Sequence, residues 1–209
     1  MQKIPAIAGD LKVVDTRKGI QLRPIDDAHH DEHEGPHEHE AAMPDPHIWL
    51  SPKLVKIQAQ TICETLCELD KPHTVQYRDN LSRFHDELDK LDAAITKSLS
   101  PFKGKEFMVF HPAFGYFADA YGLKQIAVET GGKDPSAKQL AGLIARAKKQ
   151  SIRVIFVHKQ YSKSTSEAIA ESIGGVVVPV DPLPRDYLRS MAEIARHIAE
   201  SMQPTESPR

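Results

Sequence analysis

The chain has 209 residues, is 40% hydrophobic, and carries 27 basic and 29 acidic residues for a formal net charge of −2. This mixed charge excludes the basic surface of a nucleic-acid-binding protein and the polybasic arm of a membrane-associated protein. No run of about eighteen apolar residues occurs, so no transmembrane helix is predicted, and residues 1–10 lack the hydrophobic region of a signal peptide.

The first predicted element is a short strand over residues 11–16, where β-branched residues precede a turn former. Residues 19–22 could continue this strand after a turn. From residue 26 to residue 43 the composition changes to His, Asp, Glu, Gly and Pro. This composition predicts a loop, because such a segment has almost nothing apolar to bury.

The predicted loop is rich in histidine and carboxylate side chains. Its histidines are His29, His30, His33, His37 and His39. Neutral imidazole is the commonest protein ligand for zinc, so this segment could collect zinc weakly and transiently. The alternative is a solvated low-complexity linker without a metal-binding role.

Two long helices are predicted next. Ser51 suits an N-cap and Pro52 the first helical position, and apolar residues then recur at helical spacing as far as residue 69. A second helix is predicted over residues 74–99, which contain no glycine or proline. At 1.5 Å per residue it would span about 40 Å, which suits a rigid connection between two lobes. One arm of a helical bundle is the alternative.

The two cysteines of the chain, Cys63 and Cys67, lie four residues apart within the first of these helices. They are expected to share one helix face about one turn apart. This is not the CxxC spacing of zinc ribbons or redox motifs. Two small core residues are the favoured interpretation, while a metal or disulfide role stays open.

The second half of the chain alternates between strands and helices, which predicts an α/β fold with a four-stranded parallel sheet flanked by helices. The predicted strands are 106–110, 124–128, 153–157 and 176–180, and the predicted helices are 113–121, 135–149, 162–173 and 187–202. Asp134 is expected to cap the second of these helices, with Pro135 at its first position.

Four polar side chains follow the four predicted strands: His111, Glu129, His158 and Asp181. Ligands of open parallel sheets bind at the carboxyl ends of the strands. The sequence therefore predicts a site at this edge of the sheet.

Several segments together resemble the solute-binding proteins of bacterial zinc and manganese ABC importers. These are DPHIWLSP at 45–52, the long helix, FHPAFGYFADAYGL at 110–123, GKDPSAKQLAGLI at 132–144, IRVIFVHKQYS at 152–162 and VVPVDPL at 177–183. The resemblance covers residues 11–202, and the histidine-rich loop is similar to that of the zinc-selective members.

The resemblance implies two α/β lobes joined by one rigid helix, with a metal ion between the lobes. His47 matches the second ligand of the family, His111 the third, and Asp181 the carboxylate that often supplies the fourth. His158 stands where zinc members usually have a glutamate, so it is either a substitute ligand or an ordinary surface histidine. Two imidazoles and one carboxylate suit Zn²⁺, with Mn²⁺ as the other candidate.

The family's first ligand, a histidine in the opening part of the N-terminal lobe, has no counterpart here. We therefore expect a partial N-terminal lobe. The expected division is a partial lobe over 1–72 with its histidine-rich loop at 27–43, an inter-lobe helix over 73–100, a C-terminal α/β lobe over 101–203, and a frayed tail over 204–209.

Three functions compete. The resemblance implies a monomeric, non-enzymatic protein of the periplasm or another extracytoplasmic space, which captures zinc and delivers it to an ABC transporter permease. A zinc hydrolase would need a general base, for which Glu129 is the one candidate, and no predicted helix carries an HExxH motif. An intracellular zinc buffer would be consistent with the absence of a recognisable signal peptide.

Overall fold

The computed structural model describes residues 11–25, 44–158 and 164–203. Its centre is a four-stranded parallel sheet made of β1 (Glu106–Val109), β2 (Lys124–Ala127), β3 (Val154–His158) and β4 (Val176–Val180). The strand order is β2-β1-β3-β4, so the chain reverses its direction of winding between β1 and β3. That point is where ligands bind in open sheets of this kind.

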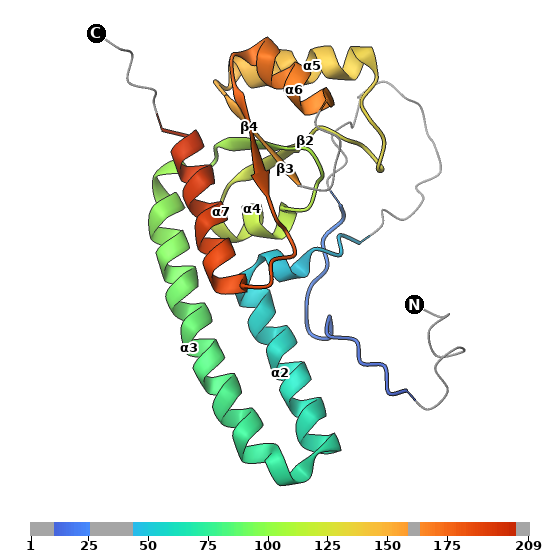
Figure 1. The fold of residues 1–209 in the computed structure, drawn as a ribbon, viewed down its shortest axis with the longest axis vertical. Helices are drawn as coiled ribbons and strands as arrows, with labels where there is room; N and C mark the ends of the chain where they lie inside the picture. The colour runs from blue at the N-terminus through green and yellow to red at the C-terminus, as the bar shows by residue number, and fades with distance from the viewer. Residues whose placement is uncertain (1–10, 26–43, 159–163, 204–209) are drawn as a thin grey trace.

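Helices cover both faces of the sheet (Figure 1). They are α4 (Gly115–Tyr121), α5 (Ala137–Lys149), α6 (Ser164–Ile173) and α7 (Tyr187–Ser201). Side chains alternate along a strand, so Phe107 and Val109 join a core that includes residues of α4 and α7. Met108 joins the second core, with residues of α5 and α6. The predicted α/β fold with a four-stranded parallel sheet is confirmed.

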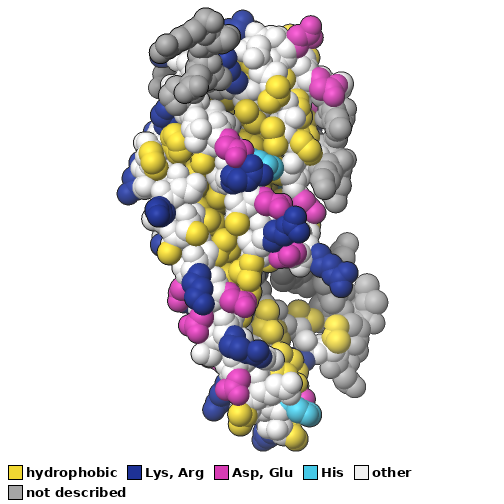
Figure 2. All heavy atoms as spheres, turned by 60° about the vertical axis from the view of Figure 1, so that its left-hand side comes forward, with side chains coloured by type: hydrophobic (Ala, Val, Ile, Leu, Met, Phe, Trp, Pro, Cys, Tyr) yellow, Lys and Arg dark blue, Asp and Glu magenta, His cyan; other side chains and the backbone are white. Residues whose placement is uncertain are grey.

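The helices α2 (Pro52–Leu69) and α3 (Thr74–Leu99) form a hairpin that extends away from the sheet in Figure 1. Short 3₁₀ turns precede α2 (Ile48–Leu50), join α2 to α3 (Lys71–His73) and follow α3 (Ser100–Phe102). The buried side chains of α3 all lie in its second half, beside the sheet: Leu88, Leu91, Ile95 and Leu99. The lower, free end of the hairpin instead shows apolar and charged side chains side by side (Figure 2).

Both helices of the hairpin have the predicted bounds. No helix in the described part of the chain has the length and apolarity that crossing a bilayer requires. The division of the chain into a partial lobe, a connecting helix and a second lobe stays a prediction.

Two local predictions are wrong. Residues 11–16 form no strand, since Leu11 and Val13 are exposed and no described segment pairs with them. The nearest ladder contact is a single antiparallel bridge between Pro24 and Pro44. Apolar alternation predicts a strand only where a neighbouring strand completes the hydrogen bonds.

The cap of α5 is Ser136 instead of Asp134. The Ser136 hydroxyl accepts from Gln139 N, while Gln139 Oε1 accepts from Ser136 N at 2.8 Å. This reciprocal pair is a capping box, which satisfies two backbone donors at once. It moves the start of the helix two residues beyond the predicted position at Pro135.

Candidate metal centre

Three histidines from distant parts of the sequence meet at the carboxyl end of the sheet. His47 lies just before α2, His111 follows β1, and His158 is the last residue of β3. The ring centroid of His111 lies 5.1 Å from that of His47 and 5.4 Å from that of His158. The switch point between β1 and β3 therefore carries a cluster of imidazoles, as the sequence predicts for His47 and His111.

The orientation of His47 is set within its own turn. Asp45 is fully buried, and its Oδ1 accepts from His47 N at 2.9 Å and lies 2.7 Å from His47 Nδ1. A carboxylate beside Nδ1 keeps the proton on that nitrogen and leaves Nε2 with a free lone pair. His47 is therefore prepared to bind a cation through Nε2.

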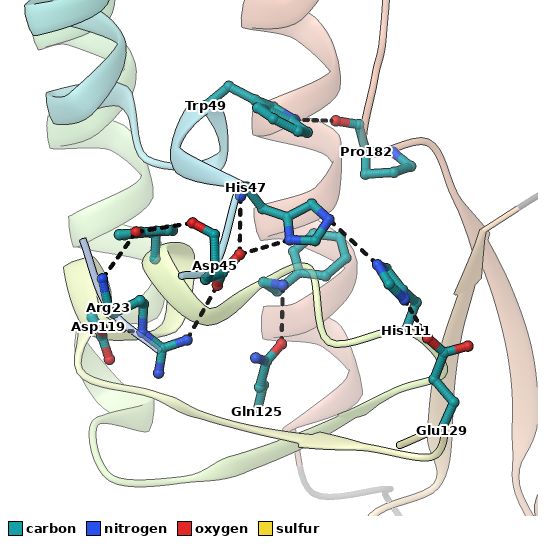
Figure 3. Close-up of polar contacts among 11 residues, drawn as sticks. Arg23, Asp45, His47, Trp49, His111, Asp119, Gln125, Glu129 and Pro182 are labelled. Atoms are coloured by element: carbon teal, nitrogen blue, oxygen red, sulfur yellow. Dashed lines mark hydrogen bonds and ion pairs between the residues drawn. The ribbon is translucent and has the colours of Figure 1, made fainter. Parts of the chain in front are cut away.

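Asp45 is itself fixed from several directions (Figure 3). Its Oδ2 lies 3.4 Å from Arg23 Nη1, and Arg23 Nε lies 2.9 Å from Asp119 Oδ2 on α4. The Tyr116 hydroxyl donates to Asp45 O and accepts from Arg23 N, each at 3.1 Å. These contacts attach the segment that carries His47 to α4.

Gly115, the first residue of α4, makes room for this arrangement. A Cβ atom at this position would lie 1.5 Å from Arg23 Nη1 and 2.9 Å from Asp45 Oδ2. The guanidinium group therefore occupies the space that any larger residue would fill. Glycine is favoured here by this close approach and not by its backbone conformation, which is ordinary helix.

His111 is oriented in the same way by a second carboxylate. Its Nδ1 is hydrogen-bonded to Glu129 Oε1, and Glu129 is buried at the end of β2. Glu129 N donates to Phe110 O at 3.0 Å, which continues the pairing of β1 with β2 beyond the strands. The parallel sheet thus places the carboxylate beside the imidazole.

The Nε2 atoms of these two histidines face each other. His47 Nε2 and His111 Nε2 are 3.3 Å apart (Figure 3). Two nitrogens bound at 2.0–2.1 Å to one tetrahedral zinc ion are separated by about 3.3–3.4 Å. When both Nδ1 atoms carry the proton, two lone pairs meet at this distance, and a cation between them would replace repulsion with two bonds.

His158 is buried beside this pair, with 6% of its surface exposed. Burial, together with the positive charges that His111 and His47 can carry, lowers the pKa of His158 to about 4. The imidazole is therefore neutral near pH 7, the form in which it binds metals. Its burial and its contact with His111 argue against the ordinary surface histidine of the sequence alternative.

Asp181 is the remaining predicted ligand within the described residues. Asp181 lies in the exposed turn after β4, where its Oδ1 accepts from Leu183 N at 2.9 Å. Its negative charge acts on His158 in the direction that raises the pKa. Within residues 11–25, 44–158 and 164–203, no three His, Cys, Asp or Glu side chains already have the arrangement of a complete metal site. The five loop histidines lie outside the described residues: His29, His30, His33, His37 and His39.

Two aromatic residues, Trp49 and Tyr116, pack around the site. Trp49 Nε1 donates to Pro182 O at 2.8 Å, and its backbone oxygen accepts from the Tyr187 hydroxyl at 2.9 Å. Tyr116 bridges two backbone positions, as described above. The Trp49 contacts join the turn after His47 to the loop after β4 and to α7.

Sequence reasoning missed how Asp45 and Arg23 act. It placed Glu129 at a strand end and considered it as a general base, but missed its hydrogen bond with His111. The Asp-Pro-His spacing was a usable signal for Asp45, because a carboxylate two residues before a ligand histidine can reach its Nδ1. Arg23 carried no such signal, since its contacts with Asp45 and Asp119 span 22 residues and more of chain.

Comparison with known proteins gives a consistent result. The family model described as "Zinc-uptake complex component A periplasmic" matches residues 1–201. The high-affinity zinc uptake system protein ZnuA of Bacillus subtilis (strain 168) is 34% identical over 168 residues, which are 79% of this chain and 53% of that protein. The chain thus spans about half the length of this curated relative.

Two solved structures are similar over almost the whole chain. A crystal structure of ZnuA has 38% sequence identity and a TM-score of 0.86, covering 97% of this chain and 74% of its own. A zinc-bound deletion mutant of ZnuA has 36% identity and a TM-score of 0.87, covering 98% and 74%.

Proposed function

Because the chain belongs to the family of periplasmic zinc-uptake complex component A proteins, we propose that it binds Zn²⁺ outside the cytoplasm and delivers it to the permease of an ABC transporter. In this proposal zinc is the cargo, and the chain acts as a monomer. The observation that carries the proposal is the pair of facing Nε2 atoms, 3.3 Å apart, on histidines whose Nδ1 atoms are each held by a buried carboxylate.

We assign His47 and His111 as the two central ligands. His158 is the third candidate, because it is neutral, buried and in ring contact with His111. Asp181 supplies the carboxylate after a movement of its exposed turn. A set dominated by imidazole nitrogen favours Zn²⁺ over Mn²⁺, which prefers oxygen ligands.

The contacts of Glu129 argue against a hydrolase. A general base must be placed to take a proton from the attacking water. Glu129 Oε1 is instead hydrogen-bonded to His111 Nδ1, the position of a carboxylate that orients a metal ligand. The family itself is one of solute-binding components of zinc uptake systems, not of enzymes.

The test is a zinc titration of this chain against a competing chelator. We expect one tightly bound zinc ion, with an affinity that falls about ten-fold or more in His47→Ala and in His111→Ala. His73→Ala is the matched control, since His73 is exposed beside Asp70 at the far end of α2. Its affinity should stay within about two-fold of the unchanged chain. Weak, multiple sites that neither central variant affects would overturn the proposal.

A further inference from the structure

The two cysteines lie on α2, well away from the histidine cluster. Cys63 stands about 16 Å along the helix from Pro52, the residue nearest the site, at 1.5 Å per residue. Both cysteines are free. The proposed zinc-uptake function makes no use of them, so their arrangement needs a separate explanation.

The two sulfur atoms converge. Cys63 Sγ and Cys67 Sγ are 3.9 Å apart, because residues four apart on a helix share one face. Cys63 is buried, whereas Cys67 is half-buried, with its sulfur 3.8 Å from Thr74 O. Solvent can therefore reach Cys67, whereas Cys63 is enclosed by its neighbours.

The separation suits a shared cation. Two thiolates bound to one tetrahedral zinc ion at about 2.3 Å are separated by about 3.8 Å. A disulfide requires a sulfur–sulfur distance near 2.05 Å, so the two side chains would have to move much further to bond to each other. The distance between the two sulfur atoms is thus close to that between two thiolates bound to one tetrahedral metal ion.

The surroundings offer room and further ligands. A cavity of about 600 Å³ lies over both sulfurs, between α2 and the start of α3. The carboxylates of Glu64 and Glu68 line it, together with the cationic side chains of Lys71 and Arg78. A cation held by the two sulfurs would therefore find a carboxylate or water to complete its coordination.

We propose that Cys63 and Cys67 form a second metal site, a dithiol site for thiophilic divalent cations of the Zn²⁺ and Cd²⁺ class, completed by Glu64 or Glu68 and water. Binding replaces two sulfur–hydrogen bonds with two sulfur–metal bonds and releases both protons to solvent, with no change in oxidation state. Burial and the contact with Cys67 raise the pKa of the Cys63 thiol, so the metal must displace a proton that is firmly held. The site is independent of the histidine cluster.

The test uses Cd²⁺ with the full chain under a non-thiol reductant, because bonds from thiolate to Cd²⁺ absorb in the ultraviolet and bonds from imidazole do not. We expect the absorption to saturate at one Cd²⁺ per chain and to persist in His111→Ala. In Cys67→Ser the absorption should be lost and the cadmium affinity of this site should fall about ten-fold or more.

Cys67→Ser is the deciding variant, since Cys67 is half-buried and the change keeps the size of the side chain. Cys63→Ala is measured beside it, with circular dichroism to check that the buried substitution leaves the helices intact. Absence of the absorption in the unchanged chain would overturn the proposal and leave the two cysteines as packing residues. An undiminished absorption in Cys67→Ser would overturn it equally.

Discussion

The two carboxylate–histidine pairs of the candidate centre are built in different ways. Asp45 and His47 are two residues apart and meet within one turn. Glu129 and His111 lie at the ends of neighbouring strands and meet because β1 pairs with β2. The first pair therefore has its internal geometry from local sequence, and the second has it from the sheet.

The difference extends to how each pair is attached. The segment of the first pair is attached to the rest of the protein by separate contacts and not by a ladder, among them those of Asp45 with Arg23, of Asp45 O with Tyr116 and of Trp49 with Pro182. Glu129 and His111 continue a hydrogen-bonded ladder. We infer that Asp45 serves both the attachment of its segment and the orientation of a ligand, whereas Glu129 serves orientation alone.

The largest expected effect comes from removing each carboxylate in turn. Asp45→Ala should lower the free energy of unfolding of the metal-free protein by about 3 kcal/mol, because a buried ion pair with Arg23 is broken. Glu129→Ala should lower it by about 1 kcal/mol, the value of one hydrogen bond. Both should weaken zinc binding by about 10–100-fold, as orienting carboxylates do.

Urea unfolding without metal gives the first quantity, and the zinc titration gives the second. Asp70→Ala is the control, since Asp70 pairs with exposed His73 at the far end of the hairpin. Equal losses of unfolding free energy in Asp45→Ala and Glu129→Ala would show that the two pairs are attached equally well, and the comparison would then fail.

The sequence predicted the sheet and the two long helices because their signals are local and repeated. The start of α2 follows from Pro52 at its first position, while Ser51 before it makes no capping hydrogen bond through its side chain. The length of α3 follows from a long run without glycine or proline. The strand over residues 11–16 was wrong for the opposite reason: a strand is defined by its neighbour, and no described segment pairs there.

The placement of the residues of the candidate site was predicted in part for a similar reason. The rule for strand ends places His111, Glu129 and His158 at one edge of the sheet, and the structure has them there. That rule predicts where a side chain lies but not which atom it contacts. It therefore could not predict the hydrogen bond between Glu129 and His111 Nδ1. No sequence pattern indicated the contact of Arg23 with Asp45, since the guanidinium group occupies the space left by Gly115.

An intermediate effect is expected from filling that space. Gly115→Ala should displace the flexible end of Arg23 from Asp45, since the new Cβ would otherwise lie 1.5 Å from Arg23 Nη1. We expect a loss of about 1–2 kcal/mol in unfolding free energy and zinc binding weakened by about three- to ten-fold, because Asp45 keeps its contacts with His47.

Gly142→Ala is the matched control for this change. Gly142 lies within α5, and a Cβ at its position would meet no atom within 4 Å. The same substitution there should leave zinc binding unchanged and raise the unfolding free energy by up to about 1 kcal/mol, the difference in helix propensity. A stabilised Gly115→Ala with normal zinc binding would show that Arg23 does not act on the site.

The smallest expected effect concerns the second attachment of the His47 segment. Trp49→Phe keeps an aromatic side chain, although a smaller one, and removes the donor to Pro182 O, which should cost about 1 kcal/mol of unfolding free energy. Zinc binding should weaken by only about two- to three-fold, because Asp45 still holds His47. Combined with Gly115→Ala, the loss in zinc affinity should exceed the sum of the single effects on a free-energy scale, since each attachment limits the movement that the other permits. Simple additivity of the two substitutions, measured by the same titration, would mean that the segment does not move as one unit.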